Sequence, residues 1–168
     1  MTGYATIDDI ARAATGGWDE LAERAIPDPR VDGTLLQLTV TGGDRSGYAA
    51  EVIALADDAL VWLSEVLAGA GRHADTYLAP RYQAVMPLSD ELIGSSDLPA
   101  AVAAIALRRL YGAQLPDAIR KGTDWADTYL RDLSAGRASL GVADTQTAQV
   151  PGRMSVQTAK KSFDWERY

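Results

Sequence analysis

Apolar residues recur every three or four positions over most of the chain, which is the spacing of amphipathic helices. The first run, residues 6–17, opens with Thr6 as a candidate N-cap and has Asp9 three positions later, an imperfect capping box. Two glycines close this run. A second run over residues 18–25 is stopped by two prolines, which a helix interior does not tolerate. The pattern therefore predicts two short helices at the start of the chain.

The longest helical pattern starts near Tyr48 and continues to about Ala79. Pro80 is expected to mark its end, because proline lacks the backbone N–H that a helix interior requires. Glycines within residues 64–74 are expected to bend this helix. Aromatic residues at helical spacing more often belong to a core than to a ligand site, so Trp62 is assigned to the buried face. The apolar positions of the pattern are Val52, Leu55, Ala56, Ala59, Trp62, Leu63, Val66, Leu67 and Ala70.

A third helical pattern covers residues 97–112 and is apolar on nearly every side through Leu107. A helix of this kind belongs in the middle of a bundle. Arg108 and Arg109 fall in its last turn, where the helix dipole favours cations. We expect them to cap the helix or to form an ion pair with another subunit.

The last helical pattern covers residues 115–136, after which no further helix is predicted. Its apolar stripe includes Trp125 and Tyr129, which are again assigned to the core, as is Tyr77 of the long helix. The stretch between the long helix and the third pattern, which begins at Gln83, is predicted to be a loop. The chain contains no internal repeats.

Residues 35–41 follow a different rule, because apolar and polar side chains alternate there. This period of two predicts a short strand, followed by a Gly-Gly-Asp turn. No second strand of similar quality follows, so a partner would have to come from the tail or from another chain. The sequence thus predicts a mostly α fold: a small helical bundle with one long helix, a short β-strand or hairpin near residues 35–41, and an extended C-terminal arm. We place the bundle at residues 1–141 and the arm at 142–168.

The composition narrows the function. A chain of 168 residues suits one domain, and without cysteine it has neither disulfides nor thiolate sites. The net charge of −7 disfavours a nucleic-acid surface, which needs clustered Lys and Arg. No stretch approaches the roughly 20 apolar residues that cross a bilayer, and the N-terminus does not look like a signal peptide. We expect a soluble protein that is intracellular when made and has no membrane partner.

The charge is unevenly distributed along the chain. Residues 150–168 hold four cations and two carboxylates, a net of +2, so the remaining residues carry −9. A tail without fixed structure is the plain alternative, yet such tails usually lack aromatic and branched apolar residues. Spaced apolar anchors in an extended segment are typical of chains that dock on a neighbour. The predicted partner-binding arm consists of Val150, Arg153, Met154, Val156, Lys160, Lys161, Phe163 and Trp165.

No catalytic, metal or cofactor site is expected. The chain's one histidine, His73, has no nucleophile or paired carboxylate at a useful spacing and is assigned to the surface. The adjacent carboxylates Asp8–Asp9 and Asp57–Asp58 do not share a helix face and so make no acid–base dyad. The glycine-rich residues 41–47 lack the Lys-Ser/Thr ending of a phosphate loop and are expected to form a turn. The sequence therefore does not suggest an enzyme.

An ordered set of short motifs suggests a family. These are "YATIDDI", "LLQLT", "ADTYLAPRY", "MPL", "DLPAAVAAIALRRLYG" and "YLRDLSAGRASLG", with a basic segment before an aromatic in "GRMSVQTAKKSF". In this order the chain resembles the Mu-like phage head-tail connector family over nearly its whole length. Two features depart from the family: residues 26–34 look longer than the usual connection, and residues 64–74 are unusually rich in glycine.

The resemblance implies a structural virion protein at the neck, the head–tail junction, made in the host cytoplasm. Copies of the chain are expected to form a ring, a dodecamer matching the portal, beneath the portal of a tailed phage. Its partners would be other copies of itself, the portal protein and a tail-side connector or tail terminator protein. DNA would pass through the ring without sequence-specific binding, and we expect acidic walls that repel its phosphates.

Two other readings remain open. A generic helical interaction module would have the same fold without a phage role, since fold alone does not settle function. A DNA-binding regulator would need a basic recognition helix. The nearest candidate is residues 117–132, where Arg120 and Lys121 are offset by three aspartates, which disfavours that reading.

Overall fold

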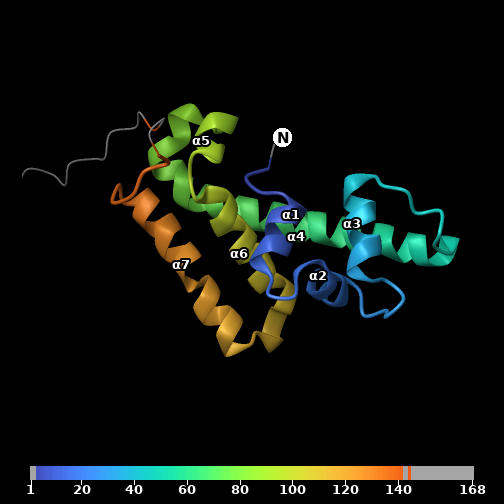
Figure 1. Cartoon of the computed structure of the whole chain (residues 1–168). Coiled ribbons are helices and arrows are strands. Elements are labelled where there is room, and N and C mark those ends of the chain that lie inside the picture. Colours follow the sequence, from blue (N-terminus) through green and yellow to red (C-terminus); the bar gives the residue numbers. More distant parts are fainter. Residues whose placement is uncertain (1–2, 142–143, 145–168) are drawn as a thin grey trace, which may run out of the picture.

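The computed structural model describes residues 3–141 and 144 and shows seven α-helices in that part of the chain. The long helix α4 runs along the whole body, and the shorter helices pack against it (Figure 1). No strand occurs among the described residues, so the predicted mostly α bundle with one long helix is confirmed. The α-helices are α1 (Ile7–Ala13), α2 (Gly17–Ala25), α3 (Gly33–Thr41), α4 (Ala50–Tyr82), α5 (Asp90–Gly94), α6 (Leu98–Tyr111) and α7 (Asp117–Ser134).

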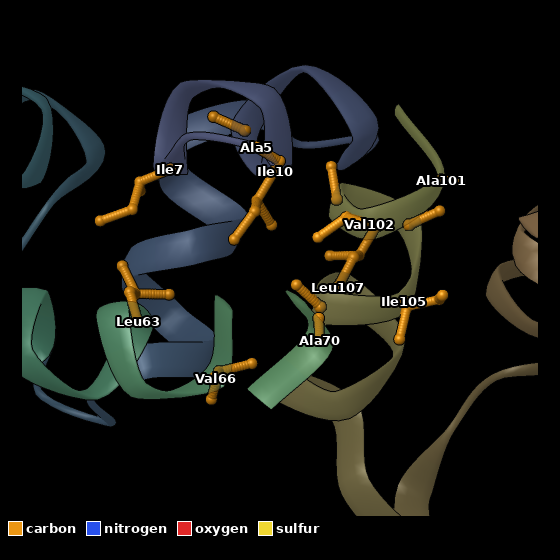
Figure 2. Packing of buried hydrophobic residues seen from close by; sticks show 14 of the residues in the cluster. Ala5, Ile7, Ile10, Leu63, Val66, Ala70, Ala101, Val102, Ile105 and Leu107 are labelled. Atoms are coloured by element: carbon orange, nitrogen blue, oxygen red, sulfur yellow. The ribbon is translucent and has the colours of Figure 1, made fainter. Parts of the chain in front are cut away.

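Helix α6 lies at the centre of the core, as its all-round apolar pattern predicts. Its residues 101–107 are all buried, and α1, α4 and α7 pack against it. Figure 2 shows side chains of α1, α4 and α6 meeting in this core, among them Ile10, Leu63 and Val102. Four of the seven buried residues are alanines. Small side chains let the neighbouring helices approach closely, and close-packed interiors leave little room for larger ones.

The two N-terminal helices form as predicted. Thr6 caps α1 and Asp9 completes a full capping box, with Thr6 N donating to Asp9 Oδ2 at 2.8 Å. Helix α2 begins one residue before the predicted range. The connection to α3 brings Gly33 so close to α2 that a β-carbon there would lie 2.5 Å from the backbone nitrogen of Asp19. Glycine is therefore needed at this position.

The predicted strand at residues 35–41 is wrong, because this segment is helix α3. Asp32 caps its start by accepting a hydrogen bond from Leu35 N at 2.7 Å, and Gly42 ends it in the left-handed conformation, with φ of 70°. Leu35, Leu36 and Thr39 are buried, which is helical spacing. The apolar positions of such a short segment fit both a strand and one face of a helix. Packing against α2 and α4 favours the helix.

Helix α4 is one unbroken helix of 33 residues, glycines and Pro80 included. The predicted end at Ala79 is thus too early by three residues. Pro80 sits in the last turn, where its missing N–H removes one helical hydrogen bond near an end that is held by other contacts. Gly69 has a packing role, since a β-carbon there would lie 2.8 Å from a guanidinium nitrogen of Arg109.

The other helix boundaries agree with the predictions to within two residues. The structure adds two elements in the stretch after α4. The predicted loop after α4 contains a 3₁₀ turn at Gln83–Val85 and the short helix α5, which Ser89 caps. The Met86–Pro87 peptide bond in this connection is cis. A second 3₁₀ turn, Gly112–Gln114, joins α6 to α7.

If α6 is the packed centre of the body, enlarging one of its buried alanines must strain the core. We expect Ala106→Leu to lower the free energy of unfolding by about 1–3 kcal/mol, because Ala106 is fully buried. The matched control is Ala100→Leu, an exposed position on the same helix with the same change in helix propensity. Urea denaturation followed by circular dichroism measures both. Equal midpoints for the two variants would contradict the close packing of α6.

Candidate interaction surfaces

All eight residues of the predicted partner-binding arm, Val150 to Trp165, lie outside the described residues. The structure instead describes where the arm begins. The last described residue is Asp144, which lies beside the C-terminal end of α4 and the closing motif after α7. We therefore start from this root and then describe the surfaces of the body that a partner could contact.

Asp144 is held in a buried site at the end of α4. Its side chain is 1% exposed, and Oδ2 accepts hydrogen bonds from the Tyr82 hydroxyl at 2.6 Å and from Leu140 N at 3.0 Å. Arg81 forms an ion pair with the same oxygen at 3.3 Å and also donates to the carbonyl of Ala138. Burial, together with the hydrogen bond to this carboxylate, raises the pKa of the Tyr82 hydroxyl, so it stays protonated and donates. The start of the arm is thereby fixed to the body.

The residue types of Leu140 and Gly141 in the closing motif "SLG", residues 139–141, are explained by burial and by contacts with Ser95. Leu140 is fully buried, and its carbonyl accepts a hydrogen bond from the Ser95 hydroxyl at 3.2 Å. Gly141 has φ of 95°, and a β-carbon there would lie 2.6 Å from the Ser95 carbonyl oxygen. Only glycine fits this turn. The motif was visible in the sequence, but the role of Asp144 was not, because its partners are about sixty residues away.

A second charged cluster joins α4, α6 and α7 around Asp127. Arg108 donates to its carboxylate at 2.5 Å, and His73 Nε2 lies 3.3 Å from its other oxygen. Partial burial alone would raise the pKa of Asp127, but the hydrogen bonds from Arg108 and His73 outweigh it and lower the pKa below its ordinary value. His73 is therefore half-buried and engaged rather than simply on the surface. Arg108 pairs within its own chain, with Asp127 at 2.5 Å and Asp124 at 3.8 Å.

A shallow groove of about 460 Å³ lies between α1, α6 and α7. Trp125 lines it and is 42% exposed, so its assignment to the core is wrong. Trp125 sits at the edge of the α7 stripe, whereas Ala126 and Leu130 make the buried contact. The groove meets a second depression that reaches Tyr129 and the closing motif. Tyr77 and Tyr129 pack against the core as predicted.

The other exposed aromatic is Trp62, whose assignment to the core is also wrong. Trp62 is 47% exposed and Val61 is 59% exposed, on the side of α4 that faces solvent. The buried side carries the adjacent Leu63, which points about 100° around the helix from Trp62. We call the exposed side the α4 outer face. It consists of Ala54, Asp58, Val61, Trp62, Glu65 and Ala68.

The charges of the α4 outer face are of one sign. The sequence contains no Lys or Arg between Arg45 and Arg72. Within the described part of the chain, Asp58 and Glu65 form no ion pair, whereas Asp57 at the edge pairs with Arg45. The face is therefore a strip of apolar and acidic side chains, and no cation among residues 3–141 forms an ion pair with Asp58 or Glu65.

In the range that the structure covers, no group of three or more His, Asp or Glu side chains is arranged to hold a metal ion. None of the helices there combines the length and apolar character that crossing a membrane requires.

The family model described as Bacteriophage Mu, Gp36 matches residues 4–158, which is nearly the whole chain. No curated protein and no solved structure matches this chain.

The buried contacts of Asp144 predict a large loss of stability when its side chain alone is replaced. Asp144→Ala removes the buried carboxylate that accepts from Tyr82 and pairs with Arg81, and we expect a loss of about 2–4 kcal/mol in the free energy of unfolding. The backbone amide of Leu140 should also exchange faster with solvent, because its acceptor is gone. Asp58→Ala, which removes an exposed carboxylate, is the control and should change neither. Unaltered exchange at Leu140 in Asp144→Ala would refute this attachment.

Proposed function

This chain belongs to the bacteriophage Mu Gp36 family, and from that premise we propose that it is a structural protein of the phage neck. In this proposal, copies of the chain form a ring beneath the portal, link the head to the tail and continue the DNA channel. The match over residues 4–158 is the observation that carries the phage role. The connector role rests on the geometry that follows and on the resemblance of the ordered motifs.

The attachment of Asp144 supports a docking arm. The 24 residues that follow it begin at a fixed point on the body, because the Asp144 carboxylate is held by Tyr82, Arg81 and Leu140 N. A fixed root lowers the entropic cost of placing a segment on a partner. The segment contains four cations and two of the chain's aromatic anchors, Phe163 and Trp165. This composition suits an acidic partner surface with apolar pockets.

The body also carries two different candidate contact surfaces at separate places along α4, and a ring needs two such surfaces on each copy. The arm root lies at the C-terminal end of α4, and the exposed Trp62 lies twenty residues earlier, about 30 Å away along the helix. Figure 1 shows α4 spanning the length of the body between these regions. A ring is built from head-to-tail contacts between two different surfaces of each copy. Two distinct surfaces on one elongated body meet that need.

Charge supports passage of DNA without binding. Residues 1–149 carry a net charge of −9, and a channel wall of that sign repels phosphates. Helix α7, the nearest candidate for a DNA-recognition helix, does not offer a basic face. Its Arg120 is engaged by Asp117 at 2.6 Å. Mobility-shift measurements with duplex DNA should therefore show no retardation by the purified chain.

A pull-down with the cognate portal protein tests the proposal. We expect the full chain to be retained on the portal as a ring of defined mass, and a chain ending at Asp144 to be retained far less. Every buried core residue among those described lies within residues 5–140, so this truncation keeps the core. A full-length variant with Phe163→Ala and Trp165→Ala provides the matched test of the anchors without shortening the chain.

The outcomes separate the parts of the proposal. Equal retention of the full and the shortened chain would show that the arm is not needed for binding to the portal. No retention of either chain would contradict the connector role and favour the generic interaction module.

A further inference from the structure

We propose that the α4 outer face is the docking site for residues 145–168 of the C-terminal arm of a neighbouring copy of this chain. The inference deepens the proposed ring and rests on that function for the arrangement between copies. It identifies which surface of the body the arm contacts. Its chemical basis is an acidic and apolar helix face that receives a basic and aromatic segment.

The face is built as a contact surface rather than as an ordinary solvated one. Val61 and Trp62 are two of the three most exposed large apolar side chains in the described range, and they are neighbours on one helix. Small residues, Ala54 and Ala68, flank them at helical spacing, so a partner backbone can approach closely on both sides. Exposed tryptophan surrounded by such positions is typical of binding hot spots.

Charge determines what the face can bind. Asp58 and Glu65 lie on either side of Val61 and Trp62 and form no ion pair in the range that the structure covers. The nearest cations in the sequence are Arg45, which precedes α4 and pairs with Asp57 at the edge of the face, and Arg72, which follows the face on the helix. A second α4 outer face would bring carboxylates against carboxylates, so self-pairing of this surface is disfavoured. The face instead suits a segment with cations beside apolar side chains.

The arm is the segment of this chain with that chemistry. Lys160 and Lys161 precede Phe163 with only Ser162 between them, and Trp165 lies four residues after Lys161. Within these six residues two cations and two aromatics accompany Asp164, and residues 145–168 as a whole keep a net charge of +2. The ammonium groups can pair with Asp58 and Glu65, and a cation can also lie over the exposed Trp62 ring.

The positions of root and face favour a contact between copies. Asp144 is fixed at one end of α4 while the face lies in the N-terminal half of the same helix (Figure 1). A copy placed head to tail presents its face to the root of the next copy, and repetition closes a ring. Twenty-four extended residues reach about 80 Å, so an arm could also fold back on its own body. The experiment below separates these two arrangements.

Disulfide trapping tests the proposal cleanly, because the chain has no cysteine of its own. The full chain receives Ser162→Cys, in the arm between Lys161 and Phe163, together with Ala68→Cys on the α4 outer face. Under a mild oxidant at millimolar protein, we expect linked dimers and a ladder of larger species on denaturing gels. The matched control pairs Ser162→Cys with Ala100→Cys, which lies in the groove between α1, α6 and α7. It should crosslink about tenfold more slowly.

A charge exchange gives a second readout that misfolding cannot mimic. We expect D58K/E65K to slow the trapping about tenfold, and K160E/K161E to do the same, because each places like charges together. Mixing the two variants restores attraction at every contact between unlike copies, so trapping between them should recover. Recovery requires that both variants are folded and that the contact is between copies.

Each remaining outcome would overturn the inference. Crosslinks confined to single chains would show that the arm binds its own body. Faster trapping at Ala100→Cys would move the site to the groove, and no trapping at either position would remove the body as the receptor of the arm. The portal pull-down uses chains without these cysteines. Retention on the portal without disulfide trapping would leave the connector role standing and reject only this docking site.

Discussion

Helix α6 has no solvent-facing side between Ala101 and Leu107, and the rest of the body is arranged to cover it. A helix that is apolar all round is stable in water only when neighbours surround it. Helices α1, α4 and α7 supply that cover, and the alanines of α6 let them come close. The ion pairs of Arg108 with α7 then fasten the end of the buried helix. The core is therefore complete within one chain, although α4 is longer than α6 needs.

That excess length separates the two features on which the proposed ring rests. The C-terminal half of α4 packs against α6 and α7 and, at Tyr82 and Arg81, holds the root of the arm. Its N-terminal half is covered on one side by α2 and α3 and keeps the other side, with Trp62, open. Because one rigid helix carries both features, their separation is fixed. A fixed separation between a docking segment and its receptor is what a ring of identical copies requires.

The sequence predicted what depends on local signals. The capping box at Thr6, the buried helix over residues 97–112 and the ends of α7 follow from spacing and breakers, and the structure confirms them. The strand prediction for residues 35–41 was wrong because six alternating positions, 36–41, are too few to separate the two periods, although Asp32 and Gly42 were the cap signals of a helix. The assignment of Trp62 and Trp125 to the core was wrong because hydrophobicity does not tell which apolar residue a neighbouring helix will cover. Asp127 and Asp144 bind side chains distant in sequence, which spacing alone does not reveal.

Electron cryomicroscopy of the phage particle that contains this chain tests the central claim most directly. We expect a closed ring of this protein at the junction of head and tail, directly beneath the portal, with the 33-residue helix α4 traceable in every copy. Density for the chain elsewhere in the particle, or its absence from purified particles, would contradict the account. An acidic channel wall in that ring would support the proposed passage of DNA, and a wall of Lys and Arg would reject it.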